Sequence, residues 1–391
     1  MSRVASPTRL LLALLATVFA CAPGAREVPT ACDGTPIDRF KELEIVDDSV
    51  VDDARARNAS AGPWSFRHAA EQMAPSTQDG GAFVHAWLDT WAAADPARGS
   101  ALQAQIVCPW LRATSANACD ATCSHCAAET LDLGKAPFRL VAISNRLDLG
   151  DNRDALSPAG EGRLVFAMTD GPADSPASLP VGVSVIFEYA LRGGAPSSWA
   201  RSWHALSGFA GFDDDYKRAL EAVTGRFVDR DADGGSALSQ ARTNDGTFGP
   251  GRVFREFALN AATGALTPRG LRNTPRPELN GSATLRAFVA DHAEDVRANL
   301  QVLPPDLRAD AIDTDLLWVV DGVDEPTRKA FADGTCNGCH ASEVPNLGGF
   351  HVSPFLRGTA KLSTFIHDPN DPSSDDLARR EGVERARLCA E

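Results

Sequence analysis

The most chemically specific residues of the chain are two cysteines and a histidine that follow one another as Cys336-Asn337-Gly338-Cys339-His340. Cys-x-x-Cys-His is the attachment pattern of c-type haem. The spacing has a physical reason, because two thiols must reach the two vinyl groups on one porphyrin edge while the adjacent histidine lies beneath the iron. The sequence therefore predicts haem covalently bound to Cys336 and Cys339, with His340 as an axial iron ligand.

The residues after the motif specify more of this site. The stretch 345–349 is similar to the loop that packs on the haem in c-type cytochromes, and the carbonyl of Pro345 is predicted to accept the Nδ1 proton of His340. The methionines are Met1, Met73 and Met168, so none follows the motif. His351 is the predicted second iron ligand, because the intervening residues let the chain pass around the haem edge. A five-coordinate iron is the other possibility.

Two other interpretations of the Cys-x-x-Cys pair stay open. The pair can close as a structural disulfide, which would make the protein a redox-silent surface binding or scaffold protein. It can also form half of a zinc site completed by His351 and either His367 or Cys389, although the gap between the two histidines is longer than zinc-binding motifs use.

A second group of cysteines, Cys108, Cys119, Cys123 and Cys126, lies in the first third of the chain. Four thiolates at these spacings could hold zinc or an iron–sulfur cluster. In an exported protein the simpler expectation is two disulfides, or one plus pairings with Cys32 or Cys389.

Acidic and polar runs give weaker signals. Asp229, Asp231 and Asp233 alternate as in the first half of a calcium-binding EF-hand loop, but Gln240 stands where that loop needs a bidentate Glu, so a solvated acidic turn is favoured over calcium. The polar runs 144–148 and 242–245 are expected to cap turns or to pair in the core. The sequence contains no GxSxG, HExxH or phosphate-binding glycine loop, so no hydrolase centre is predicted and an enzymatic activity stays open.

The elements that must position the motif follow from hydrophobic periodicity. Apolar residues at intervals of three and four predict helices, whereas β-branched and aromatic runs bounded by Gly, Pro and Asp predict strands. Helices are expected at 64–74, 82–93, 101–113, 199–206, 214–223, 236–242, 282–300 and 326–332, and strands at 138–143, 163–168, 181–190 and 253–259. The predicted fold is α+β, a mainly antiparallel sheet with packed helices, plus a small helical C-terminal segment like cytochrome c.

The beginning of the chain predicts export. Arg3 and Arg9 precede an apolar run that ends before Cys21, the order of a secretion signal, and a run this short cannot cross a bilayer core. A signal ending at cysteine is typical of a bacterial lipoprotein. The predicted divisions are a signal peptide (1–20), a tether and linker (21–60), an α+β body (61–320), the haem-motif segment (321–368) and a surface tail (369–391).

Charge and export together define the expected partners. A net charge of −14 argues against binding to nucleic acid. We expect the protein in the cell envelope, on the periplasmic or outer-membrane side, held to the membrane by lipid on Cys21 and exchanging electrons with a redox partner protein.

Several stretches taken together resemble a family of uncharacterised bacterial lipoproteins common in myxobacteria: WSFRHAAEQMA, FRLVAISNRLDL, GEGRLVFAM, VIFEYAL, GSALSQARTND and TCNGCHASE followed by FHVSP. The resemblance covers most of residues 60 to 367. It implies that Cys336, Cys339 and His340 form a haem-binding motif and that His351 matches the later histidine of the family. Glu343-Val344 departs from the acidic residue and threonine expected there. The family implies no enzymatic activity or substrate.

Overall fold

The fold was analysed in a computed structural model that describes residues 34–390, apart from 116–117, 121–122, 124, 127–129, 151–158, 314–315 and 342. The predicted signal peptide and the cysteines Cys21 and Cys32 lie outside the described residues. Within those residues, no helix combines the length and the apolar character needed to cross a bilayer.

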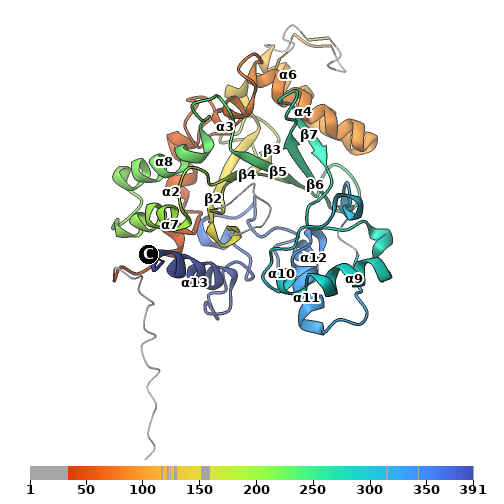
Figure 1. Ribbon diagram of the computed structural model, residues 1–391. Coiled ribbons are helices and arrows are strands. Elements are labelled where there is room, and N and C mark those ends of the chain that lie inside the picture. The colour runs from red at the N-terminus through yellow and green to blue at the C-terminus, as the bar shows by residue number, and fades with distance from the viewer. Residues whose placement is uncertain are drawn as a thin grey trace, which may run out of the picture.

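An antiparallel sheet forms the centre of the molecule (Figure 1). Its strands are β1 (Glu44–Ile45), β2 (Phe138–Arg146), β3 (Glu161–Thr169), β4 (Pro180–Ala190), β5 (Leu238–Asp245), β6 (Val253–Leu259), β7 (Leu266–Arg269) and β8 (Ile312–Asp313). The order β1 to β7 follows the sequence, and β8 pairs with β6. The four predicted strands are confirmed as β2, β3, β4 and β6, and the α+β fold class is confirmed with them.

Helices surround this sheet. They are α1 (Arg39–Glu42), α2 (Asp48–Val51), α3 (Phe66–Met73), α4 (Gly80–Ala94), α5 (Pro96–Leu102), α6 (Cys108–Thr114), α7 (Pro196–His204), α8 (Asp214–Val228), α9 (Ala283–Asp291), α10 (Ala293–Arg297), α11 (Glu325–Asp333), α12 (Cys336–His340) and α13 (Asp376–Leu388). The segment predicted as one helix at 282–300 forms α9 and α10 instead, because His292 leaves helical geometry between them.

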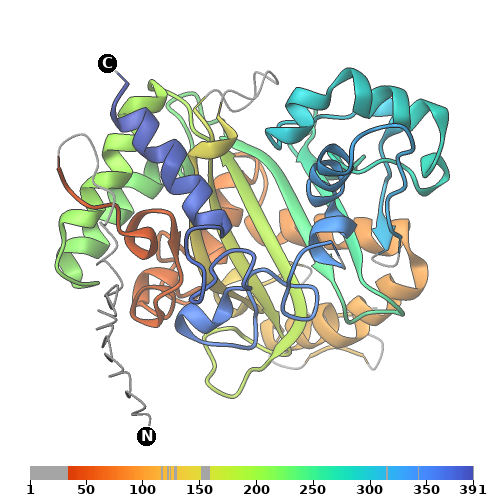
Figure 2. The same cartoon turned by 90° about the horizontal axis from the view of Figure 1, so that it is seen from below.

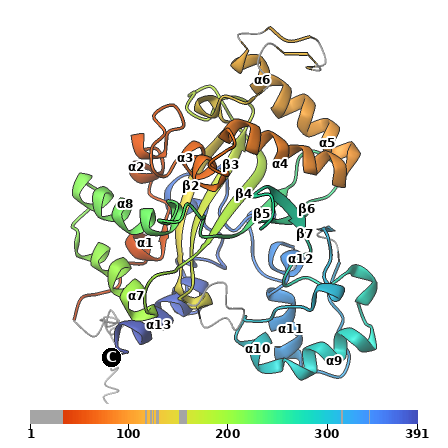
Figure 3. The same ribbon diagram turned by 45° about the horizontal axis from the view of Figure 1, so that its top comes forward.

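The two faces of the sheet differ in chemistry because side chains alternate along each strand. On β3 and β4, Leu164, Phe166, Val185 and Phe187 belong to the main apolar core, together with residues of α3, α4, α7 and α8. Figure 3 shows α3 and α4 on this face. The intervening positions include Glu161, Arg163, Ser184 and Glu188, which face the opposite side and line a cleft.

The opposite face is flanked by two smaller cores. One contains Leu43, Val141 and Leu377, and the other contains Phe254, Trp318 and Phe331. Figure 2 shows α13 and the preceding segment in front of the sheet, with α9 to α12 grouped at one side. The second core joins residues on both sides of the predicted boundary at 320, so the body and the haem-motif segment share packing in this region.

Two sequence predictions are corrected here. The segment 236–242 was predicted as a helix, but it enters strand β5, which is hydrogen-bonded between β4 and β6. Tertiary pairing therefore overrides local propensity. The segment 369–391 was predicted as a surface tail, but it contains α13, on which Leu377, Arg380 and Glu384 are buried.

Glu384 makes α13 sensitive to pH. Its side chain is 1% exposed, its Oε2 accepts a hydrogen bond from Asn145, and its Oε1 has no partner among the described residues. Burial, reinforced by the nearby Glu42 carboxylate, raises the pKa of Glu384 well above its ordinary value. The folded state therefore prefers the protonated carboxyl, so stability is lost as pH rises from the unfolded pKa through the folded pKa.

We expect Glu384→Gln to raise the melting temperature at pH 7 by a few degrees, because the amide removes a buried charge that costs about 1 kcal/mol or more. The gain should shrink as the pH is lowered toward 4, where the wild-type carboxyl is protonated in both states. Thermal unfolding between pH 4 and 8 measures this. Glu381→Gln on the same helix is the control, and it should destabilise, because Glu381 pairs with Arg39 at 2.6 Å. A Glu384→Gln protein no more stable than wild type at pH 7 would contradict the assignment.

Candidate functional site

The Cys-x-x-Cys-His motif forms the short helix α12, and its two intervening residues fix that helix in place. Asn337 is 0% exposed; its Oδ1 accepts from the Trp318 indole at 2.9 Å, and its Nδ2 donates to the Leu316 carbonyl at 2.7 Å. Gly338 lies so close to the Ala332 carbonyl at the end of α11 that a Cβ would collide with it. The Thr335 hydroxyl caps the helix by accepting from the Gly338 N–H at 3.1 Å. These contacts hold Cys336, Cys339 and His340 rigidly.

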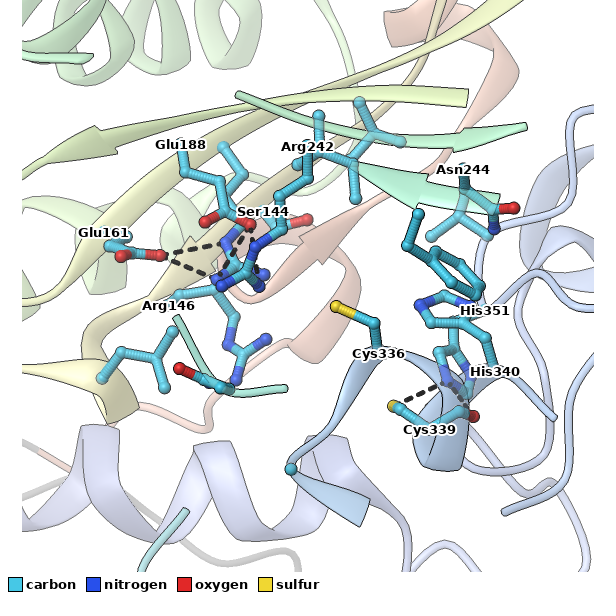
Figure 4. Close-up of a pocket in the computed structure, with 18 of the residues that line it drawn as sticks. Ser144, Arg146, Glu161, Glu188, Arg242, Asn244, Cys336, Cys339, His340 and His351 are labelled. Carbon is cyan, nitrogen blue, oxygen red and sulfur yellow. Dashed lines mark hydrogen bonds and ion pairs between the residues drawn. The ribbon is translucent and has the colours of Figure 1, made fainter. Parts of the chain in front are cut away.

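Both motif cysteines are free thiols. They lie one helical turn apart, and Figure 4 shows the Cys336 side chain directed toward Arg242 and Glu188, while Cys339 lies beside His340 and His351. Burial raises the pKa of the Cys336 thiol and raises that of Cys339 to about 12, so both are protonated at neutral pH.

His340 presents one ring nitrogen to the backbone and leaves the other available. Its Nδ1 donates to the carbonyl of Gly349 at 2.9 Å, and its ring packs against Phe254 with centroids 4.9 Å apart. Burial, with a smaller effect from the neighbouring His351, lowers the pKa of His340 well below its ordinary value. The imidazole is therefore neutral, and its Nε2 lone pair is free to bind a metal.

The carbonyl of Pro345 was predicted to accept this bond, and that prediction is wrong. Pro345 is exposed, and the Gly349 carbonyl is the acceptor instead. The turn that presents Gly349 depends on two successive glycines, Gly348 and Gly349, with φ of 62° and 86°. Side chains rarely adopt this backbone conformation, so the turn needs glycine at both positions. The Asn346 side chain holds the same turn by accepting from the Gly349 N–H at 2.7 Å.

His351 lies next to His340, with ring centroids 4.6 Å apart. Its Nδ1 is 2.8 Å from the Ser363 hydroxyl, and its Nε2 is 3.0 Å from the Cys339 carbonyl oxygen and 3.1 Å from the Cys339 sulfur. Burial lowers the pKa of His351 to about 4. One ligand atom from each of Cys339, His340 and His351 lies within 4.8 Å of the others, so the three converge as a set that could hold a metal ion.

A deep cleft separates α12 from the sheet, with an empty volume of about 1530 Å³ including its mouth. Cys336, Cys339, His340 and His351 line one side of it together with Phe350 and Phe365. The cleft therefore brings the motif residues together with the polar face of the sheet.

The floor of the cleft is a ladder of ion pairs across the sheet. Arg163 faces Glu188 across β3 and β4 at 3.2 Å, and Arg242 faces Glu256 across β5 and β6 at 3.3 Å. Arg146 donates two hydrogen bonds to Asp148 at 2.8 and 2.9 Å. The floor therefore offers hydrogen-bonding groups of both charges, although its strands are apolar on the other face.

This floor was missed in the sequence, where 144–148 and 242–245 were assigned to turns and core pairing. The available signal was the alternation of polar residues at every second position in otherwise apolar strands, as in Glu161-Gly162-Arg163 and in 240–244.

The remaining candidate residues lie away from this site. His367 pairs with Asp375 at 3.2 Å, and Cys389 is disulfide-bonded. The expectation of two disulfides in the cysteine-rich loop is confirmed as Cys108–Cys123 and Cys119–Cys126. In the acidic turn, Asp229 pairs with His68 at 2.6 Å, and the Asp231 carboxylate accepts from the backbone N–H groups of Asp233 and Gly235.

Comparisons of the chain with protein-family models, with curated proteins and with solved structures found no match.

Proposed function

We propose that the protein is a c-type haem protein that transfers electrons or senses a redox change. The observation that carries this proposal is the arrangement on α12, where two free thiols one turn apart and a neutral histidine with an available Nε2 line the same cleft. These residues fit a covalently attached haem, since each thiol can add its S–H across a vinyl group to form a thioether. The apolar side chains of Phe254, Phe350 and Phe365 in the cleft lining suit the porphyrin faces.

In this proposal Cys336 and Cys339 hold the haem and His340 binds its iron. The bound haem supplies a one-electron iron couple. The Gly349 carbonyl fixes the tautomer of His340 and increases its basicity, as second-shell partners of ligating histidines commonly do. The solvent exposure of the bound group in this cleft would contribute to its potential. His351 is the proposed second ligand, and it has to give up its contact with Cys339 to serve.

The cellular setting remains part of the proposal. A haem protein attached to the membrane by lipid on Cys21 would receive or donate electrons within the cell envelope, through a partner protein that docks near the cleft. The segment 321–368 would serve as a cytochrome c-like unit that depends on the sheet for half of its pocket. This arrangement agrees with the core that α9 to α12 share with Phe254 at the start of β6.

A second candidate is a mononuclear metal centre, such as zinc, on Cys339, His340 and His351. The convergence of their ligand atoms within 4.8 Å favours it. Thiolate and imidazole are the ligands that zinc prefers, and three protein ligands leave a fourth position open. This candidate competes with haem, because both use Cys339 and His340.

The deciding measurement is a pyridine haemochrome spectrum of denatured protein, expressed with its own leader in a host that matures c-type cytochromes. We expect a c-type band that survives denaturation and is lost in Cys336→Ser/Cys339→Ser. The matched control is Cys119→Ser/Cys126→Ser, which removes a disulfide and should keep the band. A colourless wild-type protein with about one zinc per chain by elemental analysis would favour the metal centre. A protein with neither would leave the scaffold function, and the haem proposal would be overturned.

A further inference from the structure

Asn244 connects the sheet to the turn that orients His340. It lies on β5, is 4% exposed, and donates from Nδ2 to the Gly349 carbonyl at 2.8 Å. The same carbonyl accepts the Nδ1–H of His340 at 2.9 Å. One buried oxygen therefore receives two donors, one from the histidine and one from a strand more than 90 residues away in the sequence.

Arg252 fixes the orientation of the Asn244 amide. Its Nη1 donates to the Asn244 Oδ1 at 2.6 Å, so the amide oxygen faces Arg252 and the amide nitrogen faces Gly349. Arg252 also donates to the Gly348 carbonyl at 2.6 Å, and its guanidinium lies over the Phe350 ring, 4.2 Å from the centroid. Two residues of the β5–β6 hairpin, Asn244 and Arg252, thus donate to the carbonyls of both turn glycines, Gly349 and Gly348.

The two donors compete for the electron density of one oxygen. A carbonyl that already accepts from Asn244 is a weaker acceptor for the His340 Nδ1–H, so the imidazole keeps less negative charge. An imidazole with less negative charge stabilises ferric iron less and gives a higher reduction potential. Removing the Asn244 donor strengthens the remaining bond and moves the potential down.

We propose that Asn244, held by Arg252, is a positioning residue that tunes the electron donation of His340 to the metal. The inference rests on the proposed haem function. It assigns a redox role to a polar residue of the sheet that neither contacts the motif cysteines nor binds the iron.

The test compares Asn244→Leu, which removes the donor without adding charge, with Asn244→Asp, which removes the donor but keeps an acceptor for Arg252. Asn244→Gln retains an amide donor and should restore part of the effect. Ser184→Ala is the matched control, because Ser184 lies directly across from Asn244 on β4 and also faces the cleft. We expect both donor-free variants to raise the ferric-to-ferrous ratio at a fixed potential by roughly tenfold, which is 59 mV for a one-electron couple.

A readout on haem-free protein separates this inference from the proposed function. In histidine-labelled protein, the His340 Nδ1–H resonance should move downfield in Asn244→Leu, as a strengthened hydrogen bond requires, and stay in place in Ser184→Ala. A wild type without a haemochrome band overturns the haem proposal, and the resonance then tests Asn244 alone. An unchanged potential in haem-loaded Asn244→Leu and Asn244→Asp, or an unchanged resonance in haem-free Asn244→Leu, overturns the inference while the function stands.

Discussion

Asp148→Ala is expected to lower the free energy of unfolding by about 3–5 kcal/mol, the usual cost of leaving one member of a buried ion pair without its partner. Asp148 has no exposed side-chain surface; it accepts two hydrogen bonds from Arg146 and a third from Arg379 at 2.7 Å. The substitution leaves the Arg146 guanidinium, 12% exposed, without that partner on the floor of the cleft. Denaturant unfolding at pH 7 measures the loss. Asp215→Ala, which removes a pair whose acidic side chain is 70% exposed, should change stability by less than about 1 kcal/mol.

The pH dependence of the same variant gives an independent check. Burial alone would raise the pKa of Asp148, but Arg146 and Arg379 hold it well below 3.8. A carboxyl with a depressed folded pKa contributes stability above its unfolded pKa and loses that contribution as the pH falls through the folded pKa. The difference between wild type and Asp148→Ala should therefore be constant from pH 5 to 8 and shrink below about pH 4. A difference that grows on acidification would contradict this account.

The second large effect concerns His351. In haem-loaded protein, we expect His351→Ala to keep the covalent haem but to convert a low-spin visible spectrum into a high-spin one. In the structure the His351 Nε2 donates to the Cys339 carbonyl at 3.0 Å, so binding iron through Nε2 requires the ring to leave this contact and its proton to sit on Nδ1. The Ser363 hydroxyl, 2.8 Å from Nδ1, can accept that proton and so support the tautomer that binds iron.

Ser363→Ala is the matched variant, because it removes the orienting hydroxyl and retains the imidazole. It should leave a low-spin spectrum with weakened ligation, seen as easier displacement by imidazole or cyanide. A His351→Ala protein with the wild-type spectrum would show that His351 is not a ligand. Its contacts with Cys339 would then be its role, and a low-spin iron would have another group as its second axial ligand.

The local part of the site could be predicted from the sequence, and the long-range part could not. Cys336, Cys339 and His340 are adjacent in the chain, so their spacing alone specifies a helical turn with two thiols and an imidazole. The predicted strands were correct where β-branched or aromatic runs were bounded by Gly, Pro or Asp, as at 163–168. The helix predicted at 236–242 was wrong because its residues favour a helix locally, whereas hydrogen bonds with β4 and β6 place the segment in a strand.

The contacts on the floor of the cleft could not be predicted from the sequence, for a different reason. That Arg163 faces Glu188, or that Asn244 meets Gly349, depends on strand register and on the path of a loop 105 residues away. The glycine turn likewise moved the acceptor of the His340 proton from Pro345 to Gly349, a shift of four residues that no local pattern records. Recognising period-two polar residues in apolar strands would have identified the floor, but not its partners.

The wall of the cleft beside α13 has a consequence for the order of events during synthesis. Arg380 on α13 donates to Glu44 at 2.8 Å across 336 residues of sequence, and Arg39 pairs with Glu381 in the same wall. The segment that contains Arg39 and Glu44 therefore completes this wall only when it packs against α13. Before α13 docks, Cys336 and Cys339 therefore line a cleft that lacks its wall on this side. If the cleft holds a cofactor, the docking of α13, whose Asp376 and Arg380 line the cleft, would complete the wall beside it.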